Sequence, residues 1–280
     1  MVVIIGLTGL VVFMYPSTAA WWSQYHESKA IVQFQDEVLA DKDPGNEVRL
    51  QQARKYNEKL STGQIDVSGE SRVPTLLGES DPEGEYWSLL SSAPAMMARL
   101  KIPAIDVDLP IYHGTSDTVL AHGVGHLQGT SLPVGGQDTH SVLTAHTGLA
   151  TATLFNNLKK LEVGDTFTIS VAGEVLTYEV YETQTILPEE TGSLIVQGGK
   201  DIVTLVTCTP LGINTHRYLV TAKRVTPTPE ADIAAAQAVP DIPGFPWWAV
   251  ILPAGVVAGG VFMWRAGYPP KPRKKKSADR

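Results

Sequence analysis

Three side chains with complementary chemistry stand at the ends of apolar runs in this 280-residue chain. Cys208, the only cysteine, closes the run TLVTC at 204–208. Arg217 opens the next apolar run nine residues later, so a hairpin connection would place it beside Cys208. His146 directly follows the run SVLTA at 141–145. A thiol, an imidazole and a guanidinium at strand ends can supply a nucleophile, an acid/base and an anion-stabilising donor.

Each of these residues also has an ordinary structural interpretation when it is taken alone. A single cysteine at a strand end is usually a small buried hydrophobe. A single histidine is mostly structural, and an arginine that begins a strand is usually a solvated charge. The catalytic interpretation therefore requires a fold that brings the three side chains together.

The segment 99–225 predicts a mainly β body. Seven runs are rich in β-branched residues or alternate in polarity, and they lie at 99–102, 105–112, 141–145, 165–171, 174–181, 201–207 and 217–225. Residues 171–174, with the sequence VAGE, predict a tight hairpin. Leucines at helical spacing predict one short amphipathic helix over 153–161. Seven or eight strands in about 125 residues favour a closed barrel or a sandwich.

Both ends of the chain predict membrane segments. Residues 1–26 contain no Asp, Glu, Lys or Arg, which fits either a membrane anchor or a signal segment that is removed. Residues 245–264 are 20 uncharged residues, and at 1.5 Å per residue they span about 30 Å, the thickness of a bilayer core. The basic tail at 265–280 follows directly, so we expect the tail in the cytoplasm and the body outside the cell membrane.

The distribution of charge excludes several classes of protein. The formal net charge is −7, but residues 265–280 hold seven Lys or Arg and one Asp. Residues 1–264 therefore carry 15 Lys or Arg against 28 Asp or Glu, a net charge of −13. A segment with this negative net charge is not expected to bind nucleic acid. The single cysteine excludes internal disulfides and cysteine-rich zinc modules.

Three segments connect the body to the two ends. Residues 27–62 predict a helical arm with a break at Asp43-Pro44-Gly45, its two helices solvated on the outside of the molecule. Residues 63–98 lack periodicity and are rich in Gly, Ser and Pro, which is typical of a lid or a linker. Residues 226–244 predict a tether that leads to the membrane.

The remaining candidate ligands favour structural roles. His122 and His126 are four residues apart, a spacing that suits a metal site on a helix. Two glycines lie between them and disfavour a helix, which argues against a zinc site. His113 and His140 are interpreted as loop or strand-edge residues. Asp108 alternates with Asp106 along a strand and is expected to face water.

The stretch 99–225 resembles the sortase family, in particular the class C, pilus-polymerising sortases of Gram-positive bacteria. The motifs that carry the resemblance are TLVTC at 204–208, HTG at 146–148, NTHRYLV at 214–220, IDVDLPIYHGTS at 105–116 and GVGHLQGTSLPVGG at 123–136. The two apolar ends and the basic tail also match the class C layout. The resemblance implies a closed eight-stranded sortase-type β-barrel with an N-terminal helical arm and lid, flanked by membrane helices.

The resemblance also implies an activity. In that family the cysteine attacks the Thr–Gly bond of an LPxTG-like sorting signal, and an amine resolves the thioacyl-enzyme. Carried over to this chain, Cys208 is the nucleophile, His146 the acid/base and Arg217 the donor that stabilises the oxyanion. The expected function is a membrane-anchored cysteine transpeptidase that joins the acyl group to a lysine amine of a pilin subunit. Pilins are then the partners, and no metal or organic cofactor is implied.

Three alternatives stay open at the level of sequence. A housekeeping-type sortase would anchor proteins to the cell wall, and such an enzyme would normally lack the C-terminal membrane span and the lid arm. A hydrolytic surface cysteine protease would use the same Cys208 and His146 but let water resolve the thioester. A membrane-tethered scaffold without enzymatic activity would need Cys208 to be buried and inert.

The expected lid departs from the class C pattern. Class C lids carry an Asp-Pro-aromatic signature, in which the Asp faces the catalytic arginine and the aromatic ring covers the cysteine. Here Asp81 and Pro82 are followed by Glu83, and the next aromatic residues are Tyr86 and Trp87. We expect Asp81 to face the arginine, with Tyr86 and Trp87 as candidates for the cover. A solvated acidic linker is the alternative.

Overall fold

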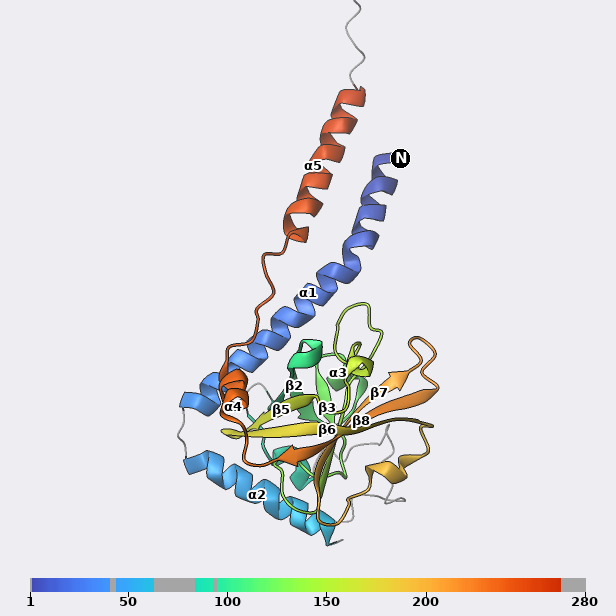
Figure 1. The fold of residues 1–280 in the computed structure, drawn as a ribbon. Coiled ribbons are helices and arrows are strands. Elements are labelled where there is room, and N and C mark those ends of the chain that lie inside the picture. Colours follow the sequence, from blue (N-terminus) through green and yellow to red (C-terminus); the bar gives the residue numbers. More distant parts are fainter. Residues whose placement is uncertain (1, 41–43, 63–83, 93–94, 268–280) are drawn as a thin grey trace, which may run out of the picture.

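A closed barrel of eight strands forms the body of the molecule (Figure 1), and this confirms the prediction of a mainly β barrel. The computed structural model describes residues 2–40, 44–62, 84–92 and 95–267. The strands are β1 (Met96–Ile102), β2 (Val107–His113), β3 (Val124–His126), β4 (Thr139–Thr144), β5 (Thr166–Val171), β6 (Glu174–Ile186), β7 (Asp201–Thr209) and β8 (His216–Val225). Their order around the barrel is β1-β2-β3-β4-β7-β8-β6-β5, and β5 closes the ring by pairing with β1.

The strand pairing is mixed. The pairs β2–β3 and β4–β7 are parallel, and the remaining pairs are antiparallel. All seven expected runs form strands, whereas β3 was missed because three residues are too short to establish a pattern. The predicted hairpin is present, since Val171 pairs with Glu174 across a two-residue turn. Ala172 and Gly173 both have positive φ, 42° and 82°, as the mirror-image turns of tight hairpins require.

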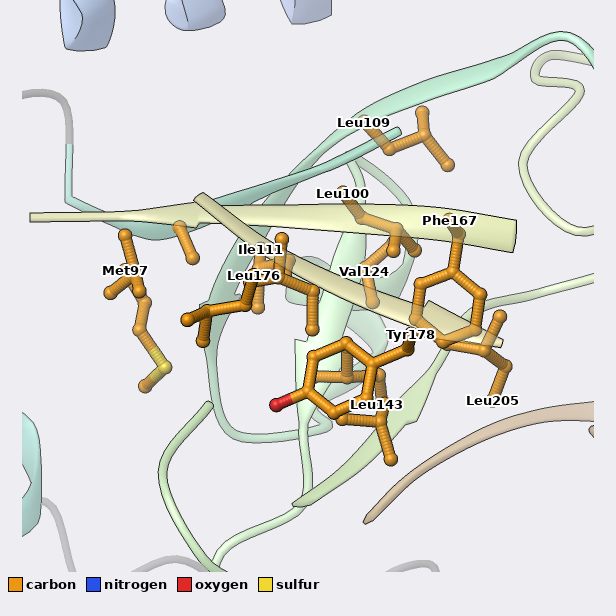
Figure 2. Packing of buried hydrophobic residues seen from close by; sticks show 14 of the residues in the cluster. Met97, Leu100, Leu109, Ile111, Val124, Leu143, Phe167, Leu176, Tyr178 and Leu205 are labelled. Carbon is orange, nitrogen blue, oxygen red and sulfur yellow. The ribbon is translucent and has the colours of Figure 1, made fainter. Parts of the chain in front are cut away.

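Apolar side chains from all eight strands fill the barrel, and Figure 2 shows part of this core. Residues labelled there include Leu100 of β1, Ile111 of β2, Leu143 of β4 and Leu205 of β7. The rings of Phe167 and Tyr178, which are paired across β5 and β6, stack with their centroids 5.7 Å apart. This packing fixes which face of each strand points inward.

The helices are α1 (Val2–Ala40), α2 (Pro44–Ser61), α3 (Asp117–Leu120), α4 (Glu230–Gln237) and α5 (Trp248–Gly267), with 3₁₀ turns η1 (Glu85–Ser88), η2 (Pro103–Ile105), η3 (Leu158–Lys160) and η4 (Thr191–Leu194). The helix expected at 153–161 was wrong, because only η3 and turns form there. Leu154 has a φ of 38°, which no α-helix accommodates. Its side chain is nevertheless buried, so the apolar face was identified correctly.

The helical arm is not solvated on all sides. Helix α1 runs without a break from the N-terminal apolar segment into the arm, and it buries Ile31 and Phe34 against Met96. Helix α2 buries Tyr56 in the barrel core. Its Asn57 exchanges two hydrogen bonds with the backbone of Leu132, at 3.0 and 2.7 Å. The arm is therefore packed against the barrel.

The expected tether at 226–244 is likewise held against the body. Arg99 is 1% exposed and donates through Nη1 to the carbonyl oxygens of Ala236 and Ala238, at 2.8 and 3.0 Å. Its Nε and Nη2 donate to the two carboxylate oxygens of Asp108, at 2.6 and 2.5 Å. The expectation that Asp108 faces water was wrong, because this carboxylate neutralises a buried guanidinium.

Two helices are long and apolar enough to cross a membrane, one within Val3–Glu37 and the other at Trp248–Gly267. Figure 1 shows α1 and α5 running antiparallel, so that the N-terminus and the end of α5 lie on the same side. A Cβ atom added to Gly255 would lie 2.8 Å from Leu10 Cδ2, and one added to Gly259 would lie 2.8 Å from Val3 Cγ1. The two glycines, four residues apart, thus permit close helix contact.

Replacing the buried arginine tests its structural role. Arg99→Leu leaves Asp108 and two buried carbonyl groups without their donor, so we expect a loss of about 3–5 kcal/mol in the free energy of unfolding. Arg54→Leu is the matched control, since Arg54 pairs with Glu174 at 2.8 Å but both side chains are largely exposed. It should cost less than about 1 kcal/mol. Urea unfolding of the detergent-solubilised variants measures both, and equal losses would contradict the assignment.

Candidate active site

Cys208 lies where β7 emerges from the interior. Residues 202–207 are buried, and Cys208 is the next residue and is partly exposed. Its thiol is free. Successive side chains of a strand alternate between faces, so Cys208 shares a face with Val206 and Thr204, whereas Leu205 points into the barrel core.

The face that carries Cys208 is the outer face of the barrel wall. Val206 belongs to a second hydrophobic cluster, separate from the barrel core, which consists of Leu127, Val142, Ile186, Leu194, Val206 and Leu219. Ile186 and Leu194 come from the end of β6 and from η4, so the connection between β6 and β7 covers this face. The cysteine therefore stands at the rim of a small covered patch outside the barrel.

Arg217 is the direct cross-strand partner of Cys208. The antiparallel ladder between β7 and β8 pairs Cys208 with Arg217 and, two residues further in, Val206 with Leu219. Directly opposed residues lie on the same face with Cβ atoms about 5 Å apart. The guanidinium donates through Nη1 to the carbonyl oxygens of Asn214 and His216, at 3.0 and 3.1 Å. Both of these hydrogen bonds, which are to described residues, use Nη1 alone.

His146 reaches the same level from the other side of β7. The parallel ladder between β4 and β7 pairs Thr144 with Val206, and Ala145 N donates to Val206 O at 3.2 Å. Thr207 Oγ1 donates to the carbonyl oxygen of Ala145 at 2.8 Å. His146 follows immediately, so the same register continued by two residues brings it level with Cys208. The β7–β8 register thus places Cys208 beside Arg217 as the hairpin interpretation expects, and His146 lies two residues beyond the end of β4.

The loop that carries His146 is held by an asparagine that the sequence analysis missed. Asn156 Oδ1 accepts hydrogen bonds from Gly148 N at 2.6 Å and from Thr147 Oγ1 at 3.2 Å. Gly148 has a φ of 81°, and a Cβ atom there would lie 2.6 Å from Leu211 Cδ1. The histidine loop thus contacts the turn between β7 and β8. No local sequence pattern identifies Asn156, because its partners lie in a turn.

This arrangement can perform acyl transfer. A cationic side chain beside a cysteine favours the nucleophilic thiolate. A guanidinium can also donate two hydrogen bonds to a developing oxyanion, and an imidazole can deliver a proton to a leaving amine. The described residues contain no group of three His, Cys, Asp or Glu side chains that could hold a metal ion.

Comparison with known protein families matches residues 100–225 to the family described as the sortase domain. Among solved structures, sortase C-1 from Actinomyces oris is 46% identical, with a TM-score of 0.58, over 64% of this chain and 98% of that one. Sortase C1 of Streptococcus agalactiae is 39% identical, with a TM-score of 0.64, over 75% of this chain and 99% of that one.

The chain belongs to the sortase family. Among curated relatives, this sortase is 32% identical to sortase D of Bacillus subtilis over 130 residues and 30% identical to sortase A of Streptococcus agalactiae over 113 residues. The matches cover 45% and 39% of this chain, and they span 63% and 45% of the two relatives.

The predicted lid falls largely outside the described residues of this sortase. Asp81 and Pro82 lie in the undescribed stretch 63–83. Tyr86 is described, and its assignment to a cover over the thiol is corrected. Its side chain is 2% exposed, and its hydroxyl lies 2.9 Å from His126 Nδ1 and accepts from Gly114 N at 2.9 Å.

The orientation of β3 shows why Tyr86 cannot cover Cys208 from this position. His126 pairs with Leu143, a barrel-core residue, so its ring points inward, to the opposite face of the wall from Cys208. Tyr86 belongs to the same barrel core, and Trp87 packs against that core with its ring centroid 5.9 Å from that of His113. Both aromatic residues fasten the chain that follows the expected lid.

The buried side chain of His140 connects β7 with the segment between β6 and β7. His140 Nε2 lies 2.8 Å from Thr204 Oγ1, and Thr204 in turn lies 3.1 Å from Thr221 Oγ1. The other ring nitrogen of His140 lies 3.0 Å from the carbonyl oxygen of Ile195, in the connection that covers the outer face. Burial lowers the pKa of His140, which favours the neutral ring. The strand-edge interpretation was therefore wrong, because His140 is fully buried and joins β4 to the connection between β6 and β7.

His126 makes stability depend on pH. Burial lowers its pKa to about 4, whereas an unfolded chain binds the proton at about 6.5. The unfolded state therefore takes up a proton first, and stability is lost as the pH falls from 6.5 towards 4. The expected contribution is about 3 kcal/mol. Urea unfolding at pH 7 and pH 4.5 should show a smaller pH effect in His126→Gln than in the wild type, and equal pH effects would contradict this assignment.

Proposed function

We propose that this sortase is a cysteine transpeptidase that cleaves an LPxTG-like sorting signal between Thr and Gly. The observation that carries the proposal is the direct pairing of Cys208 with Arg217, with His146 two residues beyond the end of the neighbouring strand β4. In the proposed reaction the thiolate attacks the threonine carbonyl, Arg217 stabilises the oxyanion, and His146 protonates the leaving glycine amine. An incoming amine then displaces the thiol from the thioester.

We propose that the incoming amine is a lysine of a pilin subunit. The solved structures that support this are sortase C proteins, and one from Streptococcus pneumoniae is described as giving insight into pilin substrate specificity. That protein is 38% identical, with a TM-score of 0.62, over 72% of this chain and 98% of its own. A scaffold without activity would need a buried thiol, whereas Cys208 is partly exposed.

We propose further that α1 and α5 both cross the membrane, with the two chain ends in the cytoplasm and the barrel outside. The antiparallel contact of the two helices and the basic tail after α5 support this topology. Trp21 Nε1 donates to the carbonyl oxygen of Gly244 at 2.8 Å, which ties the outer ends of the two spans together. The continuity of α1 into the packed arm favours an anchor over a removed signal segment.

Removing the nucleophile tests the activity. Cys208→Ala should abolish both the thioester and the joined product, because the only thiol of the chain is lost while the β7–β8 ladder is kept. Mass spectrometry of the detergent-solubilised protein incubated with an LPxTG peptide and a lysine-bearing pilin measures both species. Joined product at the wild-type rate from Cys208→Ala would refute the proposal, and a wild-type product made only by hydrolysis would favour the protease alternative.

The shape of the oxyanion donor gives a separate test. Arg217→Lys keeps the positive charge but loses the planar fork, so we expect the rate of thioester formation to fall by about 10²- to 10³-fold. Single-turnover kinetics with the same peptide measures this step. Lys223→Arg, at an exposed position of the same strand, is the control and should have no effect. A wild-type rate for Arg217→Lys would mean that a point charge is sufficient.

The paired membrane helices predict a specific cross-link. In a Cys208→Ala background, Val3→Cys with Gly259→Cys should form a disulfide under mild oxidation, because the Cβ position of Gly259 is 2.8 Å from Val3 Cγ1. Val3→Cys with Gly260→Cys is the control, since nothing lies within 4 Å of a Cβ atom at Gly260. Alkylation followed by mass measurement counts the free thiols. Equal cross-linking of the two pairs would contradict the helix contact.

A further inference from the structure

A cavity of about 810 Å³ lies at the foot of the two membrane helices, outside the row of catalytic residues. Helix α1 provides one wall, with side chains from Tyr15 to Glu27, and α5 provides Trp248 and Leu252. The body closes the cavity with residues that include Tyr112 of β2. Its size falls within the range of small-molecule binding sites.

The chemical character of the cavity is acidic and aromatic. Glu27 is the only Asp, Glu, Lys or Arg among the residues that line it, and the other titratable groups besides tyrosine are His26 and His122. Two tryptophans, Trp22 and Trp248, line it together with two tyrosines. A carboxylate combined with aromatic faces is the combination that binds an ammonium group.

The carboxylate of Glu27 can accept further hydrogen bonds from a ligand. Its Oε1 accepts a hydrogen bond from Ser23 Oγ at 2.7 Å. Within the part of the chain that the structure describes, Glu27 forms no ion pair. His122 directs its Nδ1 to the carbonyl oxygen of Thr118 at 2.8 Å. The cavity therefore holds one carboxylate, and no Lys or Arg is among the residues that line it.

The position of the cavity identifies the source of the ammonium group. The cavity lies where the apolar part of α1 ends and where α5 begins, which is the level of lipid headgroups if both helices span the membrane as proposed. Tyr15 and Trp22 are 59% and 57% exposed, as aromatic side chains at a bilayer interface are. An occupant of this cavity can therefore arrive from the outer leaflet with its acyl chains beside the helices.

We propose that this cavity binds the ammonium headgroup of a membrane lipid, with the ammonium on Glu27 and against the surrounding aromatic rings. The site rests on the proposed topology and is independent of the chemistry of Cys208. Thr151 lines the cavity five residues after His146. A bound headgroup would thus contact the loop that carries the catalytic histidine and link the body to the bilayer surface.

Lipid retention by the full chain tests the site. The chain is reconstituted in nanodiscs of phosphatidylglycerol and phosphatidylethanolamine, and native mass spectrometry counts the lipids that stay bound after release. We expect preferential retention of phosphatidylethanolamine, and retention that is weaker by about tenfold in Glu27→Gln. Trp22→Leu, at an exposed position, should also weaken retention. Glu47→Gln is the control, because Glu47 likewise bonds a side chain four residues away, that of Gln51, and lies far along the chain on α2.

Two further experiments test whether the charged ammonium group is required and whether it comes from a membrane lipid or from a soluble compound. N-acetylated phosphatidylethanolamine lacks the charge and should not be retained. Soluble glycerophosphoethanolamine should compete only weakly, and competition equal to that of the lipid would overturn a membrane source. Equal retention in the wild type, Glu27→Gln and Trp22→Leu would overturn the site. None of these measurements uses the transpeptidase activity, so a failure here is distinguishable from a failure of the proposed function.

Discussion

The register of three neighbouring strands is the constraint on which the site depends. β7 pairs in parallel with β4 on one side and antiparallel with β8 on the other. Paired residues of the three strands therefore lie side by side, with their side chains on the same face of the barrel wall. Cys208 and Arg217 are paired near the end of the β7–β8 ladder, and His146 lies two residues beyond the end of β4. A shift of one residue in either ladder would turn one of the three side chains to the opposite face. The barrel core and the covered outer cluster both fix that register, since Leu205 must point inward and Val206 outward.

Much of this site could be predicted from the sequence, because its signals are local. A buried run that ends in cysteine, a short turn and a following run that opens with arginine are enough to place Cys208 beside Arg217. The long strands have clear patterns for the same reason. β3 and Asn156 have no comparable signal, since one is a three-residue strand and the other acts through a turn.

The errors about the segment 226–244 and about Tyr86 share a different cause, which is contact over long distances in sequence. Arg99 binds backbone groups 137 and 139 residues away, and no pattern near either end indicates that the connecting segment is docked. Tyr86 lies beside aromatic and acidic residues in sequence, but its hydroxyl partner is His126 in the barrel. In both cases a polar group buried by tertiary packing needed a partner, and the fold supplied one from elsewhere in the chain.

The unbroken course of α1 has a consequence for how the enzyme searches for substrates. The helix continues for 14 residues beyond the apolar segment, to Ala40, which corresponds to a length of about 21 Å. The segment that leads to α5 is held against the barrel by the hydrogen bonds of Arg99. In the proposed topology, a barrel held at two points by short, packed connections keeps its height and tilt above the bilayer, unlike one on a flexible linker. The proposed catalytic residues would then move within a thin layer parallel to the membrane as the protein diffuses laterally. Substrates confined to that layer meet it at a high effective concentration, whereas peptides free in the surrounding volume do not.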